Sequence, residues 1–240
     1  MALMNGLTSR PLYLQLRVAL AERIAKGEWK AGGAIPNESD LAREFGVSPG
    51  TMRKALDLLE SDRLVTRKQG RGTFVNDQTS DDLAIRFNNI RCDNGKRLNG
   101  HADSAEATEG KANELECLRL GLRPYDSVYR IRRIRLHDSL PFMLEEMSLP
   151  AALFPGLATG ESPTQAIVVL ALQYGLLVSK AEERVSLRTA SPAVALALNI
   201  APCSPVMVLD RVVMTLDGRP IEWRVGHCHL VEHHYLVEMS

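Results

Sequence analysis

Two sets of helix start and stop signals lie almost back to back in the first quarter of this 240-residue chain. Asn37 can cap a helix over residues 38–45, and Gly46 follows as its terminator. Ser48 then precedes Pro49, a residue type favoured at the first position of a helix. Because side-chain oxygens accept from the first free amides and glycine readily ends a helix, this spacing predicts a helix-turn-helix.

An amphipathic helix is expected before this pair. An apolar residue recurs at every fourth position, as Leu12, Leu16, Leu20 and Ile24. This period places the four side chains on one face and predicts about four turns of helix. Pro11 would be its first residue, and Gly27 would follow its last turn.

The second helix of the pair has one apolar and one polar face. The apolar stripe consists of Met52, Ala55, Leu56 and Leu59. The residues left on the outer side or near its edge are Thr51, Arg53, Lys54 and Asp57. In helix-turn-helix proteins the early outer residues of this helix meet base edges and phosphates.

Two short runs of strand-forming residues follow, Val65–Arg67 and Thr73–Val75. They flank a turn over residues 68–72 that contains two glycines, so a hairpin is expected. Its tip would carry Arg67, Lys68 and Arg71 together. Glycine allows close backbone approach to a phosphate wall, and a narrow minor groove attracts arginine. The pattern predicts a winged helix-turn-helix.

Charge is divided unevenly along the chain. Overall, 29 Lys and Arg balance 29 Asp and Glu, which excludes a basic or acidic tail as the dominant character. Residues 1–75 contain 12 Lys and Arg against 8 Asp and Glu, so the remainder has a net charge of −4. The basic excess favours nucleic-acid binding by the first part, although helix-turn-helix units also occur as plain packing modules.

Residues 10–76 closely resemble the DNA-binding domain of the GntR superfamily of bacterial transcriptional regulators. The sharpest pieces are Leu-Ala-x-x-Phe-Gly-Val-Ser, Thr-x-Arg-x-Ala-Leu and Gln-Gly-Arg-Gly-Thr-Phe-Val. The resemblance implies a winged helix-turn-helix domain over residues 1–76 that binds double-stranded operator DNA. Together with the outer face, it indicates these DNA-binding residues: Ser48, Gly50, Thr51, Arg53, Lys54, Arg67, Lys68, Gln69, Gly70, Arg71 and Gly72.

Two positions depart from the pattern of that family. Ser39 stands where members often have an arginine, and residues 48–51 read Ser-Pro-Gly-Thr where Ser-Arg-x-Thr is common. An arginine paired with guanine contributes about 1–3 kcal/mol of discrimination, so we expect an operator that differs from the usual sequence.

Residues 77–240 are predicted to form a second domain. Residues 77–103 are rich in Asn, Asp and Gly and read as a linker with a short strand at most. Beyond them, the pattern predicts helices over 112–120, 164–174 and 192–198 and strands over 127–136, 141–149, 181–189, 205–216 and 220–230. Antiparallel strands with separate helices indicate a mixed α/β (α+β) domain.

Part of this domain is an internal repeat. At an offset of 78, Leu118, Leu120, Pro124, Val128 and Arg133 correspond to Leu196, Leu198, Pro202, Val206 and Arg211, and Pro141 matches Pro220 at 79. Each copy would form a helix and a hairpin around one sheet. The cleft between the copies is the predicted ligand site.

This half resembles the UTRA effector-binding domain of HutC-like GntR regulators. The matching stretches are VYRIRRIRLHDSLPFMLEEMSLPAALFPGL, the Tyr-Gly-Leu at residues 174–176, and DGRPIEW. The resemblance implies a chorismate-lyase-like antiparallel sheet domain that dimerises and binds a small-molecule effector. The effector-binding residues it implies are Arg133, Arg135, Glu145, Thr164 and Glu222.

Arg133 and Arg135 also stand out by themselves, because they alternate onto one face of a strand. Two guanidinium groups with a common direction suit a phosphate or a carboxylate. The alternative is a pair of solvated arginines that bind Glu145 or Glu146.

Four of the six histidines lie between His227 and His234. His227 and His229 share a strand face, but Cys228 points the other way and no Asp or Cys lies at zinc spacing. We predict no metal site and expect surface or dimer-interface histidines, with effector contact or a metal as alternatives. The four cysteines form no Cys-x-x-Cys pair and are expected to be reduced.

The longest apolar run, residues 166–172, is far shorter than the roughly 20 residues of a membrane span, and no signal peptide is evident. No Ser-His-Asp spacing, P-loop or Rossmann motif indicates catalysis or a cofactor. We therefore predict a cytoplasmic, homodimeric regulator, foremost a repressor, controlled by a small anionic effector. The alternatives are an activator, a metal-sensing regulator, and an enzyme or hybrid on the chorismate-lyase-like fold.

Overall fold

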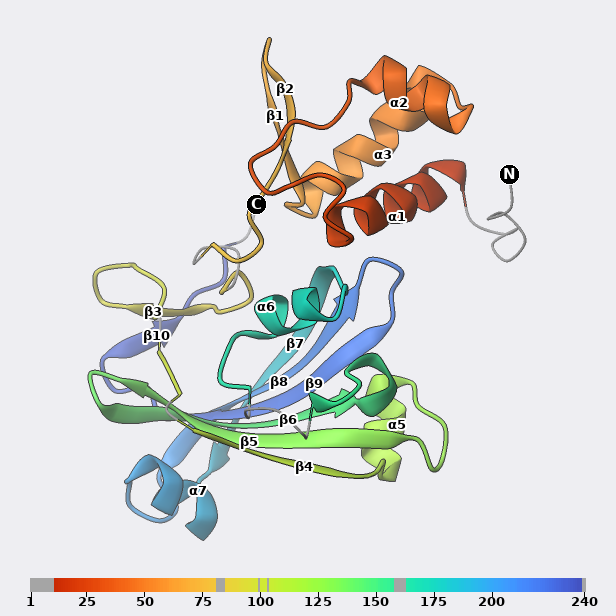
Figure 1. Ribbon diagram of the computed structural model, residues 1–240. Coiled ribbons are helices and arrows are strands. Elements are labelled where there is room, and N and C mark those ends of the chain that lie inside the picture. The colour runs from red at the N-terminus through yellow and green to blue at the C-terminus, as the bar shows by residue number, and fades with distance from the viewer. Residues whose placement is uncertain (1–10, 81–84, 99, 103, 158–162, 239–240) are drawn as a thin grey trace. The chain divides into compact units, whose positions relative to one another are not determined.

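The computed structural model describes residues 11–80, 85–98, 100–102, 104–157 and 163–238. The chain divides into two compact units (Figure 1), one that contains residues 1–83 and one that contains residues 84–174 and 178–240. Each unit has a core of its own.

Three helices and a hairpin make up the first unit. The elements are α1 (Leu12–Ala25), α2 (Glu38–Phe45), α3 (Pro49–Ser61), β1 (Val65–Lys68) and β2 (Gly72–Val75). The two strands pair antiparallel. This is the predicted winged helix-turn-helix.

The capping residues explain where α2 and α3 begin and end. The Asn37 side chain accepts a hydrogen bond from a backbone amide of α2, and Gly46 is left-handed after its last turn. Ser48 caps α3 in the same way, and Pro49 is its first residue. At α1 the structure differs from the expectation, because Pro11 is the N-cap and the helix begins one residue later.

Apolar side chains from all three helices and the start of the hairpin fill the core of this unit. The largest fully buried ones are Leu20, Leu41, Met52, Leu56, Leu59 and Leu64. The Ile35 amide donates to the Thr73 carbonyl at 2.9 Å. This bond joins the chain before α2 to the hairpin and holds the hairpin against the helices.

An antiparallel six-stranded sheet in the order β4-β5-β6-β9-β8-β7 forms the second unit. Its strands are β4 (Ala105–Lys111), β5 (Ser127–His137), β6 (Leu140–Pro150), β7 (Val178–Thr189), β8 (Pro205–Thr215) and β9 (Pro220–Cys228). The helices are α5 (Glu114–Leu120), α6 (Ile167–Gln173) and α7 (Pro192–Leu198), with a 3-10 turn η1 (Ala151–Leu153). A separate pair consists of β3 (Ile90–Cys92) and β10 (His233–Tyr235).

The internal repeat appears as two halves of this sheet. The units β4-α5-β5-β6 and β7-α7-β8-β9 have the same element order, and β6 pairs with β9 at the centre. Arg133 pairs in register with Glu145 in the first half, and Arg211 pairs with Arg224 in the second. The predicted duplication thus corresponds to two equivalent hairpins that meet across one strand pair.

The two faces of the sheet are covered differently (Figure 1). Leu144 and Glu145 are neighbours on β6, so their side chains point to opposite faces. Leu144 packs in a cluster with Leu198 of α7, whereas Glu145 lines a cavity beneath α6 and residues 85–88. Within the described residues, no helix is long and apolar enough to cross a membrane.

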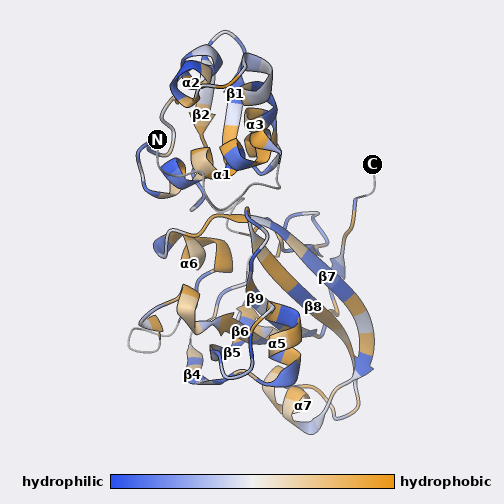
Figure 2. Ribbon diagram, turned by 90° about the vertical axis from the view of Figure 1, so that its right-hand side faces the viewer, coloured by the Kyte–Doolittle hydropathy of each residue, from blue (hydrophilic) through white to orange (hydrophobic). Residues whose placement is uncertain are grey.

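The edge strand β4 and the short strand β10 were not predicted from the sequence, and the predicted ends of α5, α6, β7 and β9 differ from the observed ones by two or three residues. β4 reads Ala-Glu-Ala-Thr-Glu-Gly-Lys, and all of these residue types except Thr are depleted in strands, although they are tolerated at an edge with one neighbour. The opposite edge strand, β7, is also rich in charged residues, whereas β8 beside it is mainly hydrophobic (Figure 2). α6 is shorter than the predicted helix over 164–174, and β7 begins three residues before residue 181.

Candidate functional site

The outer face of α3 and the start of that helix are exposed in the first unit. Gly50, Arg53 and Lys54 are exposed, and Thr51 is half-buried. The hydroxyls of Ser48 and Thr51 lie 2.8 Å apart, and the Thr51 amide donates to Ser48 Oγ at 3.2 Å. Both hydroxyls are therefore fixed at the N-terminus of α3, where free backbone amides favour a phosphate.

Arg53 and Lys54 are held by different partners. The Arg53 guanidinium donates to both carboxylate oxygens of Glu38 on α2, at 3.1 and 2.7 Å. Its side chain remains 64% exposed, so the ion pair is at the surface and open to competition by a phosphate or a base. Lys54 Nζ lies 4.0 Å from the centre of the Tyr13 ring.

Arg67 does not join Lys68 and Arg71 at the tip of the hairpin, contrary to the expectation. Its guanidinium turns back to α3, where it forms ion pairs with Asp57 and Glu60. Its amide also donates to Glu60 Oε1 at 2.8 Å. The acidic side of α3 therefore competes with DNA for this arginine.

The tip of the hairpin is an exposed turn that contains Gln69 and Arg71. Gly70 and Gly72 have φ values of +70° and +109°, in the region that favours glycine. The Arg71 amide closes the turn by donating to the Lys68 carbonyl at 2.9 Å. The two glycines thus shape the turn that presents the Arg71 side chain to solvent.

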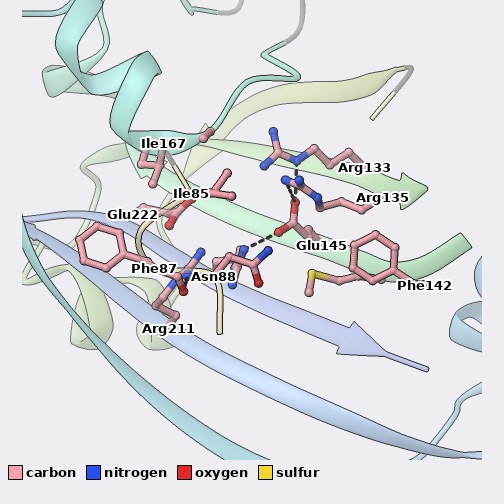
Figure 3. A pocket seen from close by; sticks show the side chains of 13 residues that line it. Ile85, Phe87, Asn88, Arg133, Arg135, Phe142, Glu145, Ile167, Arg211 and Glu222 are labelled. Carbon is pink, nitrogen blue, oxygen red and sulfur yellow. Dashed lines mark hydrogen bonds and ion pairs between the residues drawn. The ribbon is translucent and has the colours of Figure 1, made fainter. Parts of the chain in front are cut away.

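A cavity lies between the sheet of the second unit and the layer formed by α6 and residues 85–88 (Figure 3). Its volume of about 40 Å³ holds a few water molecules. Four of the five predicted effector-binding residues line it, namely Arg133, Arg135, Glu145 and Glu222. The remaining lining residues are Ile85, Phe87, Asn88, Phe142, Met143, Ala166, Ile167, Arg211 and Arg224.

Glu145 is the centre of the charge network in this cavity. It is fully buried and accepts from Arg133 Nε at 2.6 Å and from Arg224 Nη1 at 2.5 Å, while Arg135 Nη1 lies 4.0 Å away. Burial alone would raise its pKa, but the three guanidinium groups outweigh burial and hold that pKa well below its usual range. Glu145 is therefore a carboxylate. The alternative of solvated arginines paired with Glu145 or Glu146 is confirmed in its pairing, because Arg133 binds Glu145, but Arg133 is buried and not solvated, with 5% exposed.

Arg211 and Arg224 extend the network into the second repeat. Arg211 Nη1 donates to the Phe87 carbonyl at 2.6 Å, and its Nε lies 3.8 Å from Glu183. Arg224 Nη2 donates to Glu183 at 3.5 Å. The Nε atoms of both arginines are buried and have no hydrogen-bond partner among the described residues. Burial, together with the charge of Arg224, lowers the pKa of Arg211 to about 10.

Glu222 is a second buried carboxyl in the cavity, and it differs from Glu145. It is 2% exposed, and its Oε2 finds no hydrogen-bond partner in the described part of the chain. Burial raises the pKa of this carboxyl, although Arg211 and Arg224 act in the opposite direction. In its protonated form such a carboxyl donates a hydrogen bond as well as accepting one.

Thr164 lies apart from the other predicted effector-binding residues. Its side chain is exposed and does not line the cavity. The backbone on either side of it does contact the site, since the Pro163 and Gln165 carbonyls accept from Arg133 Nη1 at 3.2 and 2.9 Å. The segment therefore positions Arg133 through its backbone.

The sequence analysis did not assign Arg211 and Arg224 to the site. The internal repeat could have indicated Arg211, because this residue is equivalent to Arg133 at an offset of 78. Arg224 is likewise the equivalent of Glu145 at an offset of 79. Phe87 and Asn88, which cover the cavity, lie in the region expected to be a linker and have no periodic pattern.

The C-terminal histidines do not form a ligand cluster around Cys228. Cys228 is buried in an apolar cluster, and burial raises the pKa of its thiol to about 12. His227 on the opposite face of β9 is half-buried, and burial lowers its pKa. Among the described residues, the set that could hold a metal contains neither His227 nor His229.

Two known protein families match this chain. Residues 12–75 match the bacterial regulatory proteins of the gntR family, and residues 98–234 match the UTRA domain. The chain belongs to the GntR family. Both resemblances drawn from the sequence are thereby confirmed, and the protein is a GntR-type transcriptional regulator with a UTRA domain.

Two bacterial relatives support this assignment. The mannosyl-D-glycerate transport/metabolism system repressor MngR of Escherichia coli is 28% identical over 89% of this chain and 90% of its own length. The HTH-type transcriptional regulator Rv0792c of Mycobacterium tuberculosis is 31% identical over 91% of this chain and 82% of its own. The matched families and these relatives are transcriptional regulators, not enzymes.

A solved structure shows the same fold. The possible transcriptional regulator YydK from Bacillus subtilis is similar over 95% of this chain and 99% of its own, with a TM-score of 0.56 and 16% identity. The predicted fold class, a winged helix-turn-helix followed by an α+β antiparallel sheet domain, is confirmed.

Proposed function

We propose that this GntR/UTRA regulator is a repressor that binds operator DNA as a homodimer and is released by a small anionic metabolite in the UTRA cavity. Repression is supported by the function in the name of MngR. A dimer is supported by the way helix-turn-helix proteins read two half-sites. The observation that carries the anionic ligand is the excess of four arginines over two glutamates around one cavity.

A carboxylate or phosphate suits this cavity better than a neutral ligand. Arg211 and Arg224 each retain a buried Nε that has no hydrogen-bond partner in the described chain. A guanidinium donates strong, directional hydrogen bonds to both kinds of anion. The Glu222 carboxyl, whose Oε2 is also unpartnered, would accept from or donate to a hydroxyl of the same ligand.

Entry of a metabolite requires the cover of the cavity to move, because about 40 Å³ holds only a few waters. Arg211 holds this cover through its bond to the Phe87 carbonyl. An anion that takes Arg211 away from Phe87 would release residues 85–88, which follow the DNA-binding unit in the chain. The anion can shift the equilibrium between the covered and the released form of the cavity only by the difference between its affinities for these two forms.

The test is operator binding in the presence of candidate ligands. The full-length protein is titrated by fluorescence anisotropy against DNA from upstream of its own gene, and phosphorylated and carboxylated metabolites are screened for release. Sedimentation of the complex should give two chains for each duplex. Absence of specific DNA binding at low salt, or binding of one chain only, would overturn the proposal.

Two arginine variants test the cavity. Arg211→Gln should lose at least about tenfold in sensitivity to the releasing anion, the cost of one charge-assisted hydrogen bond. Because it also lacks the bond to the Phe87 carbonyl, it should bind the operator more weakly than the wild type when no anion is present. Arg132→Gln is the matched control, because Arg132 lies on β5 with its side chain 45% exposed. An equal loss of sensitivity to the anion in both variants would show that the anion binds outside this cavity.

A further inference from the structure

A second cluster of chemically reactive side chains lies away from the charged cavity. Cys92 on β3, His137 at the end of β5 and His233 on β10 each offer one metal-ligand atom, and these atoms all lie within 4.8 Å of one another. The three side chains are half-buried. Cys92 is a free cysteine, so its sulfur is available as a ligand.

The fold itself brings these residues together. The register of the β3–β10 pair places His233 opposite Cys92. The His137 and His233 rings meet edge to face with their centres 5.3 Å apart, and Phe142 lies parallel to His233 at 6.5 Å. One strand pairing and two ring contacts therefore hold the ligands in place.

We propose that Cys92, His137 and His233 form a zinc(II) site with three protein ligands and one open position. One thiolate with two imidazoles is a set that suits a borderline-soft metal such as zinc. The thiol proton passes to solvent when the metal binds, because the thiolate is the ligand. Water fills the fourth position, as at other zinc sites with three protein ligands.

The distances fit zinc after a small adjustment. Bond lengths of about 2.3 Å to sulfur and about 2.0–2.1 Å to nitrogen place tetrahedral ligand atoms about 3.3–3.6 Å apart. The observed limit of 4.8 Å requires a closure of about 1 Å, which rotation of half-buried side chains supplies. The Asp138 carboxylate lies 3.7 Å from His137 Nε2, where it can orient the ring in the manner common for histidine ligands.

The zinc site would brace the cover of the cavity. Cys92 follows shortly after Phe87 and Asn88, which line the cavity, and Phe142 both lines the cavity and stacks on His233. A metal that joins β3 and β10 to the end of β5 would restrain this wall. This consequence rests on the proposed effector function, whereas the metal site does not.

Cobalt(II) binding to the full-length protein tests the site directly. The protein is reduced, stripped with a chelator and titrated with Co²⁺. We expect one Co²⁺ per chain, with a thiolate-to-metal charge-transfer band and the visible bands of a tetrahedral ion, and displacement by Zn²⁺. Cys92→Ser should lose the charge-transfer band. His137→Gln and His233→Gln should each bind at least about tenfold more weakly.

Two control variants distinguish this site from adventitious binding. Cys203→Ser removes an exposed thiol, and His234→Gln removes the exposed neighbour of His233, so both should bind Co²⁺ like the wild type. The thermal midpoint should rise with Zn²⁺ in the wild type and in the controls but not in Cys92→Ser. Absence of a thiolate band in the wild type, or its persistence in Cys92→Ser, would overturn the proposal without any DNA or effector measurement.

Discussion

Glu145 and Arg224 form a 2.5 Å ion pair across the centre of the sheet, although they occupy equivalent positions in the two repeats. An exact repeat would place two like charges here, and two buried like charges repel strongly. Because the first repeat has Glu145 where the second has Arg224, the two halves can pack their charged faces together without this repulsion. The same pair links the arginines of the first repeat to those of the second through a single carboxylate.

Replacing Glu145 should unfold the second unit more readily than any neighbouring change. Glu145→Gln leaves Arg133, Arg135 and Arg224 without their shared counter-charge, and breaking a buried pair costs about 3–5 kcal/mol. The measurement is the free energy of unfolding in urea.

Glu146→Gln is the control for that experiment. Glu146 is adjacent in the chain but its side chain is 55% exposed, and it forms a long ion pair with Arg132 at 3.9 Å. We expect its effect to stay within about 0.5 kcal/mol. Similar losses in the two variants would show that the buried network contributes little.

Glu222 should make stability depend on pH in a direction opposite to that of an ordinary surface carboxylate. Its pKa is raised above the ordinary 4.5 by burial, so the folded state holds more protons than the unfolded state above that value. The contribution of Glu222 to stability is complete below pH 4.5 and is lost as the pH rises through the folded pKa.

Glu222→Gln stays neutral and should therefore become more stable relative to the wild type as the pH increases. Urea unfolding at several values between about pH 5 and pH 8 measures this difference. The exposed Glu232→Gln is the control and should show a constant difference. A constant difference for Glu222→Gln as well would contradict a raised pKa.

Loss of the cap on α3 should destabilise the first unit. Ser48→Ala removes the acceptor of the Thr51 amide, a change that costs about 0.5–2 kcal/mol. Unfolding followed by a probe in the first unit measures it, and Ser48→Gly should lose only a few tenths of a kcal/mol. Ser39→Ala, an exposed change on α2, should have no comparable effect.

The tip of the hairpin should contribute to the salt dependence of operator binding. Each phosphate contact contributes about 0.9 to the slope of log K against log salt, so Arg71→Gln should reduce the slope of a dimer by about 2. Lys26→Gln, on an exposed lysine after α1, should leave the slope unchanged. An unchanged slope in Arg71→Gln would remove this arginine from the DNA contacts.

The first unit could be predicted closely because its signals are local. The side chains of Asn37 and Ser48 accept from backbone amides at the start of their own helices, and the Gly46 amide donates to carbonyls at the end of α2, so their positions alone define where these helices begin or end. The orientation of Arg67 could not be predicted in this way. It depends on Asp57 and Glu60, which lie ten and seven residues away on a different element.

In the second unit, the strands of the two repeats could be predicted from the sequence, but the segment that covers the cavity between them could not. Arg133 and Glu145 lie on long strands with clear periodicity, and the repeat pointed to Arg211. The chain around Phe87 has no period, because its place is set by contacts such as the one from Arg211. Cys92 and His233 are brought together only by the pairing of β3 with β10.

The position of the charged cavity also determines how many such cavities each chain contains. A pocket contained within one repeat would occur twice in each chain, once in each half of the sheet. This cavity takes Arg133 and Glu145 from one half and Arg211 and Glu222 from the other, so duplication produces it once. A ligand bound there would meet different walls at its two ends and would need no symmetry of its own, and calorimetric titration with the proposed anion should saturate at one molecule per chain.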